Sequence, residues 1–534
     1  MIRKSSSLGR FSSTFSRLET TRREKSTLTL SDAKLEENID AEWKSAKPYD
    51  LIPGPKPLPL IGNVARFFPV IGESDVLPLA EMVTLLRQKY GEVVKLEGIP
   101  GRRRCVFLFD PNHCEKVYRT EGPWPSRISM ETIELYRKRR DDVYKGEYGL
   151  VSSQGKEWHQ FRSKVNQHLM QPRTIRPHID PIDQVAGDFI EKIRDLRDTE
   201  SLEMPAYFNN EMNKWALESM CVITFDHRMG CLEPNLSSDS ESQLLIDNVH
   251  DMFDLLYKLE ILPSLWKLYE TRDLKKLFQV FDSLTRITGK YVHQAKQRLA
   301  KKSTKDIGES SVLEKLIGVD EQTTTVMIMD MLTAGVDTTS NAASGVIYYI
   351  ATNPEVQEKL RKEAFEVLTS KTSPVTLDIL NNIPYLKAVI KESMRMMPIA
   401  VGNLRTTTSD IVIGGYRIPK NVSCVFSSIF QPFFLMSQDP KYFPDNTKFI
   451  PERWLKESSA TTHSAKKAHP FAYMPFGFGP RTCIGRRFAQ LEIETLLIKL
   501  MRNFRLEWHH GTLQFKSGFI NTVGSPLRVK MIDI

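Results

Sequence analysis

The sequence predicts a mainly helical protein with small regions of β-sheet, folded as one large domain. Most of the 534 residues follow helical patterns. Strand-like patterns are confined to residues 92–108, parts of 405–425, and 504–531. Neither an internal repeat nor a mid-chain linker divides the chain, and the polar stretches 233–242 and 301–311 are expected to be surface loops.

The first 18 residues are typical of a mitochondrial presequence. They are rich in arginine and serine and contain no acid before Glu19, and their apolar and basic residues would lie on separate faces of a helix. A disordered basic tail is the alternative. No apolar run near the N-terminus reaches the roughly 18 residues that a membrane span needs. We assign residues 1–45 to the presequence and its lead-in, and residues 46–534 to the folded domain, which begins with the stiff, proline-rich segment 52–57.

The composition limits the classes of protein to which the chain belongs. It carries 74 lysines and arginines against 65 aspartates and glutamates, and the net charge of +9 indicates an acidic partner or an anionic membrane surface. No recognised nucleic-acid-binding motif accompanies this charge, so we expect no nucleic acid partner. The six cysteines are scattered, without a C-x-x-C pair, which favours a reducing compartment over a disulfide-stapled secreted protein.

A long helix is predicted over residues 320–353, capped by the aspartate at its start and stopped by the proline that follows. At ~1.5 Å per residue it would run roughly 50 Å, enough to cross a whole domain. Near its middle, Gly335 lies beside the acid–alcohol pair Asp337 and Thr338, and Thr338 points where Ala334 leaves room. A helix breaker beside such a pair is often functional. Close packing against a neighbouring helix, with Asp337 merely hydrogen-bonded, is the alternative.

Residues 476–485, Phe-Gly-Phe-Gly-Pro-Arg-Thr-Cys-Ile-Gly, place Cys483 in a glycine-rich loop before a helix-like run. Three glycines are expected to let the backbone turn tightly and approach a flat ligand where any Cβ would clash. Backbone N–H groups near Cys483 and the following helix N-terminus are expected to stabilise a thiolate, the form of cysteine that binds metal. An inert buried cysteine is the alternative, and the length of the pattern argues against it. The glycines concerned are Gly477, Gly479 and Gly485.

These motifs resemble those of the cytochrome P-450 family, whose haem-binding signature matches residues 476–485. The resemblance runs from about Ile52 to the C-terminus and implies a single large domain that binds haem b. It implies that Cys483 is the axial ligand of the haem iron, to which it supplies electron density that favours O–O cleavage. It also implies that Asp337 and Thr338 deliver protons during catalysis.

Further residues match the pattern of the family. Trp158 and Arg162 lie at i,i+4 and resemble its W-x-x-x-R motif, which implies contact with the haem propionates, because arginine can bind a carboxylate with two hydrogen bonds. Glu392 and Arg395 lie at i,i+3, and such pairs usually decorate a solvated surface. In the family, this pair and the residue matching Arg453 form a buried ion network with a structural role. The residues assigned to the propionates are Trp158, Arg162, Arg405 and Arg481.

Several stretches resemble the mitochondrial branch of the family, namely 121–127, 228–232, 335–340 and 485–487. The resemblance implies electrons from a small acidic [2Fe-2S] ferredoxin, itself reduced by a flavoprotein that uses NADPH. Lys387 and Lys391 project from one helix face and match the lysines with which that branch docks ferredoxin. Arg486 and Arg487 follow the cysteine loop and are expected to join this docking surface. A solvated basic helix face is the alternative, and Gln490 stands where branch members often carry an acid.

The predicted activity is that of a monooxygenase, which activates O2 with two electrons and hydroxylates an apolar substrate. By resemblance, the substrate class is sterol-like or secosteroid-like. Some relatives rearrange peroxides and need neither O2 nor electrons, but they commonly lack the acid–alcohol pair that this chain retains. A haem sensor or carrier would need no proton relay. A hydrolytic role for Cys483 would need a histidine base, which the sequence does not assign.

Residues 261–266 are expected to touch a membrane surface. This apolar segment ends on Trp266 and is followed by Lys267, a combination that suits an interface because the ring straddles the boundary and the lysine reaches water. Ordinary core packing of Trp266 is the alternative. The predicted location is therefore the mitochondrion, on the matrix face of the inner membrane.

Overall fold

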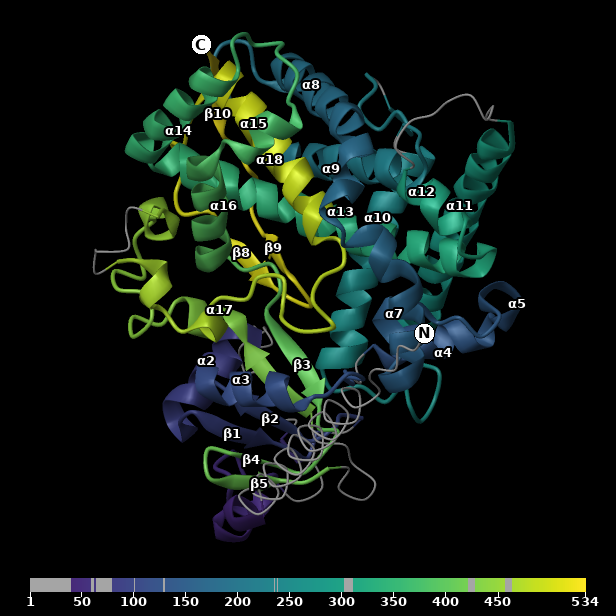
Figure 1. The fold of residues 1–534 in the computed structure, drawn as a ribbon, viewed down its shortest axis with the longest axis vertical. Helices are drawn as coiled ribbons and strands as arrows, with labels where there is room; N and C mark the ends of the chain where they lie inside the picture. Colours follow the sequence, from purple (N-terminus) through teal and green to yellow (C-terminus); the bar gives the residue numbers. More distant parts are fainter. Residues whose placement is uncertain are drawn as a thin grey trace, which may run out of the picture.

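The structure, a computed structural model, describes residues 40–58, 62–63, 79–99, 101–127, 130–234, 236–237, 239–301, 311–420, 428–456 and 463–534. These residues form a mainly helical domain, as predicted (Figure 1). A π-helical turn, η4 (Tyr257–Ile261), follows α10. The α-helices are α2 (Leu79–Tyr90), α3 (Pro111–Thr120), α4 (Glu131–Arg139), α5 (Asp141–Tyr144), α6 (Gly149–Ser152), α7 (Gly155–Leu169), α8 (Ile179–Leu196), α9 (Phe208–Thr224), α10 (Glu241–Leu256), α11 (Arg272–Lys301), α12 (Val312–Ile317), α13 (Glu321–Thr352), α14 (Pro354–Val367), α15 (Leu377–Asn381), α16 (Pro384–Met396), α17 (Phe433–Ser437) and α18 (Arg486–Asn503).

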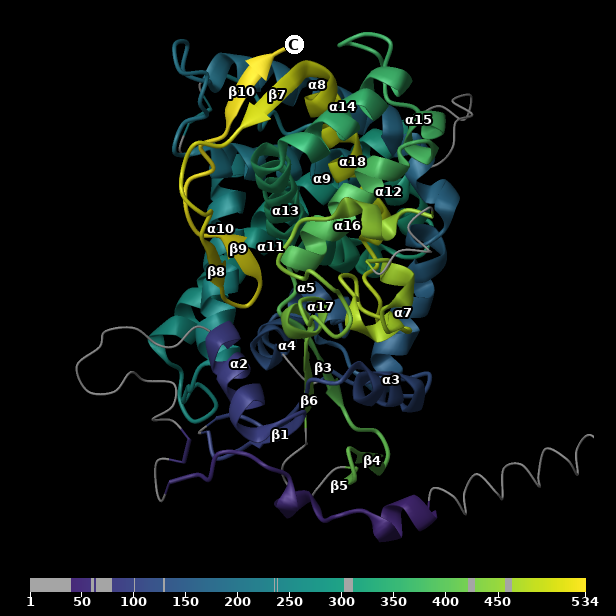
Figure 2. The ribbon, with the colours of Figure 1, turned by 90° about the vertical axis from the view of Figure 1, so that its left-hand side faces the viewer.

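Helix α13 runs through the interior of the helical region (Figures 1 and 2). The Asp320 side chain caps it by accepting a hydrogen bond from the Thr323 N–H at 2.6 Å. The helix ends just before Pro354, whose ring cannot continue it. It packs against α9, α11, α16 and α18, so apolar side chains are buried on all its sides. The predicted helix over 320–353 is therefore confirmed.

The strands form one four-stranded sheet and three two-stranded sheets. The large sheet has the order β1 (Val93–Leu96), β2 (Cys105–Leu108), β6 (Ser428–Pro432), β3 (Gly402–Thr406), with β2 and β6 parallel and the other neighbours antiparallel. The small sheets pair β4 (Ile411–Ile413) with β5 (Tyr416–Ile418), β7 (Phe504–Glu507) with β10 (Lys530–Asp533), and β8 (Phe515–Ser517) with β9 (Asn521–Val523). Strands occur in all three predicted stretches. Strand β6 was not predicted, because both strands that pair with it are distant in sequence.

The large sheet lies at one end of the molecule with α2 and α3, and the other helices form the rest of it (Figure 2). The main apolar core joins the long helices, and two smaller apolar clusters lie against the sheet. Strand β3 thereby approaches the loop that precedes α18. This loop contains Cys483.

Two predictions about the surface have different outcomes. The expectation that Trp266 contacts a membrane is wrong: it is 8% exposed, and its indole N–H donates to the Leu259 carbonyl at 2.9 Å. Leu268 and Tyr269, which follow it, are instead exposed. The five described cysteines are free, as expected for a reducing compartment.

No helix in the described part of the chain is both long and apolar enough to cross a membrane. Most of the predicted presequence, residues 1–39, lies outside the described residues.

Candidate functional site

The loop before α18 holds Cys483 through backbone geometry. Gly477 and Gly479 have φ angles of +72° and +74°, in the left-handed region that glycine adopts without strain. A Cβ on Gly479 would lie 2.8 Å from Oε1 of Glu121, so close packing also requires glycine there. The Cys483 N–H donates to the Phe476 carbonyl at 2.9 Å, which closes the loop.

Gly485 differs from the other two glycines, and the expectation that it supplies a tight turn is wrong. Its φ is −83°, an ordinary value for the residue that precedes α18. A Cβ at this position would meet no atom of the described residues within 4 Å. The space beside Gly485 is therefore open, and the backbone there places no demand on residue type.

The Cys483 thiol lies deep in the protein and borders an open space. The protein around the thiol raises its pKa by burial. The side chain is nevertheless exposed, on the side that borders the open space. The N–H groups of Gly485 and Arg486 and the charge of Arg162 lower the pKa, as predicted, but burial outweighs them. Coordination to a metal would deprotonate such a thiol. No hydrogen bond of the described residues joins Cys483 to a histidine.

Two arginines flank Trp158 beside this loop. The guanidinium carbon of Arg481 lies 4.5 Å from the ring centroid, and that of Arg162 lies 6.0 Å from it. Arg481 donates to the Pro125 carbonyl at 3.0 Å, and Arg162 donates to the Thr482 carbonyl at 3.0 Å. Nη1 of Arg481 and Nε of Arg162 are buried without a hydrogen-bond partner among the described residues. Both arginines therefore retain donors for a further acceptor.

Arg405 and Arg127 add to this positive charge. Arg405, on β3, forms a buried ion pair with Glu121, and Arg127 has a buried Nε without a partner in the described chain. Burial, followed by the charges of Arg127 and Arg405, lowers the pKa of Arg481 to about 8. Burial lowers the pKa of Arg127 to about 10. Among the described residues, these four arginines thus lie near one carboxylate, that of Glu121, and such an excess of buried charge calls for an anionic ligand. The four are Arg127, Arg162, Arg405 and Arg481.

These residues fit haem, which has one metal ion and two propionate groups. Cys483 would hold the iron, and the unpaired donors of Arg127, Arg162 and Arg481 would bind the propionates. Arg405 is the least available of the four, because its charge is matched by Glu121. Sequence reasoning did not assign Arg127 to the propionates, although it lies in the stretch 121–127 that resembles the mitochondrial branch.

The middle of α13 borders a second open space. Ala334 is exposed although most of the helix is buried, and it lines a pocket of ≈ 90 Å³. Thr338, one turn further on, is half-buried and its Oγ1 donates to the Ala334 carbonyl at 2.7 Å. A Cβ on Gly335 would lie 2.8 Å from the sulfur of Met220 on α9. Glycine therefore permits close packing of the two helices here, and the helix is unbroken.

Asp337 contacts a histidine that sequence reasoning missed. Oδ1 of Asp337 lies 3.2 Å from Nε2 of His250 on α10; the acid side chain is 3% exposed and the histidine 44%. Burial lowers the pKa of His250, but Asp337 and the charges of Asp247 and Asp254 outweigh it, so the pKa is raised. His250 thus connects a buried carboxylate with solvent. Its position on a distant helix left no signal in the sequence around Asp337.

Glu392 is the centre of a buried ion network. Its carboxylate accepts hydrogen bonds from Nε and Nη2 of Arg395 at 3.0 and 2.9 Å, and from Nε of Arg453 at 3.1 Å. The Trp454 indole at 2.9 Å and the Ile450 N–H at 3.0 Å complete the set. All three charged side chains are 0% exposed.

The four basic residues assigned to partner docking are not equivalent. Lys387 and Arg487 each donate to a backbone carbonyl of another segment, so their charged groups are already engaged. Lys391 and Arg486 are exposed. Burial of part of its side chain, followed by the charges of Arg486 and Lys387, lowers the pKa of Lys391, which indicates that these cations lie close together.

The chain is similar to known proteins over most of its length. The family model described as "Cytochrome P450" matches residues 52–523. The probable mitochondrial cytochrome P450 12a5 of Drosophila melanogaster is 40% identical over 93% of each chain. The probable mitochondrial cytochrome P450 12b2 of the same species is 37% identical over 94% of this chain and 92% of its own. Cytochrome P450 CYP12A2 of Musca domestica is 38% identical over 92% of this chain and 93% of its own. The chain therefore belongs to the cytochrome P450 family of haem-thiolate monooxygenases.

Proposed function

We propose that this protein is a mitochondrial monooxygenase that takes two electrons from a small acidic [2Fe-2S] ferredoxin and hydroxylates an apolar, sterol-like or secosteroid-like substrate. A flavoprotein that uses NADPH would reduce the ferredoxin. The observation that carries this proposal is the exposed pair Lys391 and Arg486, since Arg486 lies three residues after Cys483. The relatives named mitochondrial support the same choice of electron donor.

The charges around this pair favour an acidic partner. Lys387 adds a third cation nearby, although its ammonium group is bound to the Leu380 carbonyl. Glu494 on α18 is the acid that interacts with both lysines, and burial, despite these lysines, raises its pKa to about 7. The acid is therefore partly neutral near pH 7, and the surface remains strongly basic.

The residues of the site have separate roles in the proposed reaction. Cys483, as its thiolate, would hold the haem iron and supply it with the electron density that favours O–O cleavage. Nε2 of His250 would pass a proton to Oδ1 of Asp337, and water would carry it to Oγ1 of Thr338. Thr338 would present the proton to the open space beside Ala334.

We further propose that residues 1–45 are a presequence and that the folded domain from residue 46 onward lies on the matrix face of the inner membrane. The exposed Leu268 and Tyr269, rather than Trp266, would make the membrane contact. Attaching residues 1–45 to a cytosolic reporter and imaging it tests the presequence, because a reporter that stays in the cytosol contradicts the assignment.

The electron donor is tested by reconstituting the purified protein with a [2Fe-2S] ferredoxin and its reductase. Lys391→Glu combined with Arg486→Glu should raise the apparent KM for ferredoxin steeply, because it removes the positive charges that steer an acidic partner to this surface. The effect should be largest at low salt, because high salt screens these charges. Substrate binding and the spectrum of the CO adduct should be unchanged. Lys371→Glu is a matched control, since the Lys371 carbonyl contacts Asn503 at the other end of α18, about 25 Å from Arg486. A double variant that accepts electrons as well as the wild type would place the docking surface elsewhere.

A further inference from the structure

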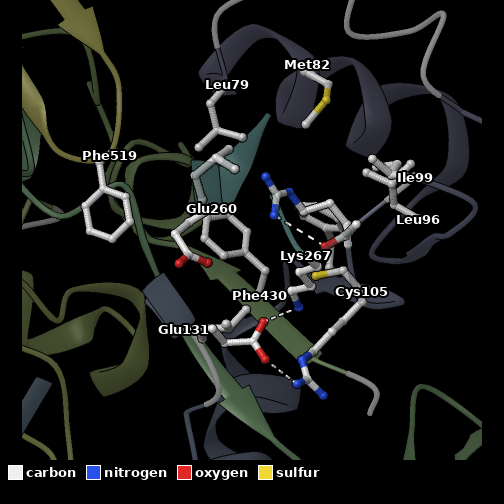
Figure 3. Close-up of a pocket in the computed structure, with 16 residues that line it drawn as sticks. Leu79, Met82, Leu96, Ile99, Cys105, Glu131, Glu260, Lys267, Phe430 and Phe519 are labelled. Atoms are coloured by element: carbon white, nitrogen blue, oxygen red, sulfur yellow. Dashed lines mark hydrogen bonds and ion pairs between the residues drawn. The ribbon is translucent and has the colours of Figure 1, made fainter. Parts of the chain in front are cut away.

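A pocket between α2, the large sheet and η4 is lined by apolar side chains together with two acidic and three basic residues (Figure 3). The pocket has a volume of ≈ 160 Å³. Phe519 lines both this pocket and the one beside Ala334, so the two spaces adjoin. The apolar side chains that line it include Leu79, Met82, Leu96, Ile99, Phe430 and Phe519.

Glu260 lines this pocket with one carboxylate oxygen unused. Its Oε1 accepts hydrogen bonds from the N–H and the hydroxyl of Thr132, at 2.8 and 2.7 Å. Its Oε2 accepts none from the described residues, and burial raises the pKa of the carboxyl. The π-helical turn η4 carries Glu260. Such turns are rare in proteins, and those that occur frequently lie at functional sites.

The other acid of the pocket differs from Glu260 in this respect. Glu131 forms ion pairs with Arg103 at 2.6 Å and with Lys267, one through each oxygen (Figure 3). Of the two acids, Glu260 therefore has the free acceptor. An otherwise apolar ligand that reaches this end of the pocket must offer a hydrogen-bond donor, or leave a half-buried carboxylate oxygen without a partner.

The charges of the pocket decide which kind of donor is suitable. Three cations, Arg102, Arg103 and Lys267, lie around two carboxylates, so the lining has a positive excess. The Arg102 guanidinium is engaged by backbone carbonyls, including that of Leu262 at 2.9 Å. This excess positive charge would repel a cationic ligand, whereas it would not repel a neutral hydroxyl group.

We propose that Glu260 determines substrate choice by accepting a hydrogen bond from a hydroxyl group of an otherwise apolar, sterol-like substrate. This inference rests on the proposed function and narrows its substrate class. A site built to bind a hydroxyl group discriminates strongly against the analogue that lacks it, because the buried acceptor is then unpaired. Ethers and ketones of the same skeleton have no donor and would be rejected in the same way.

The test titrates the haem protein with a sterol, its methyl ether at the hydroxyl position, and the corresponding deoxy compound, and follows the haem spin-state shift. The wild type should bind the alcohol about 10-fold or more tightly than the other two. Glu260→Gln keeps an oxygen for Thr132 but turns the free acceptor into an N–H donor, so its preference should pass to the ether. Glu131→Gln is the matched control and should keep the preference for the alcohol, because its oxygens are engaged by Arg103 and Lys267.

Equal binding of alcohol and ether by the wild type overturns the role of Glu260 and leaves the sterol-like substrate class intact. The same conclusion holds if Glu260→Gln, with an unchanged CO spectrum, keeps the wild-type preference. If none of the three compounds shifts the spin state while the CO spectrum shows thiolate ligation, both the substrate class and the role of Glu260 are wrong. The comparison of ligands on the wild type needs no variant, so a variant that fails to fold does not block the test.

Discussion

Replacing Glu392 by alanine should destabilise the protein more than any change to a surface ion pair. The substitution removes a carboxylate that accepts five hydrogen bonds from Arg395, Arg453, Trp454 and the Ile450 backbone. Both arginines are 0% exposed, so their charges would remain buried without the acid that balances them. Neither can reach water without a movement of the chain around it.

Breaking a buried ion pair by removing one partner costs about 3–5 kcal/mol, which corresponds to a roughly 10²–10⁴-fold change in the unfolding equilibrium. Native proteins are stable by only about 5–15 kcal/mol, so this loss is a large fraction of the total. Glu358 and Arg361 on α14 form a matched control, since they are also a glutamate–arginine pair at i,i+3, joined at 3.1 Å. The Glu358 side chain is 73% exposed, and a pair of this kind contributes about 0–1 kcal/mol.

The assay is urea unfolding of each haem-loaded variant, followed by tryptophan fluorescence and by the haem absorbance. Glu392→Ala should lower the urea midpoint strongly and release haem early, whereas Glu358→Ala should behave as the wild type. Since the network is expected to be structural, product formed per folded haem should be unchanged in Glu392→Ala at low temperature. The reasoning is refuted if the two variants lose the same stability, or if Glu392→Ala is stable and inactive.

Cys483→His, if it retains haem, should lose both activity and the red-shifted Soret band that the CO adduct of thiolate-bound haem shows; retention of that band would exclude Cys483 as the ligand. Thr338→Ala should bind haem and substrate but divert electrons to peroxide, and Asp337→Asn should slow turnover by about 10²–10⁴-fold; unchanged coupling of electrons to product in both contradicts the relay. Because the pKa of His250 is raised, its proton is present below pH 6.5 and lost as pH rises through the raised pKa. Turnover should fall over that range in the wild type and lack this dependence in His250→Gln, as a pH–rate profile would reveal. Glu494, whose pKa is raised to about 7, gains its charge above that pH, so the KM for ferredoxin should rise as pH increases through 7 and stay flat in Glu494→Gln.

Most of the fold could be predicted because its signals are local. The ends of α13 follow from Asp320, which caps the helix, and Pro354, which cannot continue it. The cysteine loop is likewise encoded within ten residues, and Gly477 and Gly479 adopt the left-handed backbone that their type permits. Strand β6 has no such signal, because its partners β2 and β3 set its hydrogen bonds.

The candidate site was only partly predictable, because burial and hydrogen bonds between distant segments decide which side chains remain free. Lys391 and Lys387 look alike in sequence, yet only Lys387 donates to a carbonyl of another segment. An apolar run ending on Trp266 suits a core and an interface equally, and its hydrogen bond to Leu259 decides for the core. The sequence around Asp337 does not indicate its contact with His250, since the fold alone brings α10 beside α13.

The sequence by itself determined the resemblance to haem-thiolate enzymes, because the cysteine, its loop and the helix behind it are contiguous residues whose pattern is visible without the rest of the chain. Only the tertiary structure decided how charge is balanced around that ligand. Arg481 meets the carbonyl of Pro125, 356 positions earlier in the chain, and four arginines gather about one glutamate. It also decided that one oxygen of Glu260 accepts no hydrogen bond from the described residues in a pocket that combines apolar and charged side chains. Such features arise where segments remote in sequence meet, since electrostatic energy depends on distance in space and on burial, and neither quantity is written in the order of the residues.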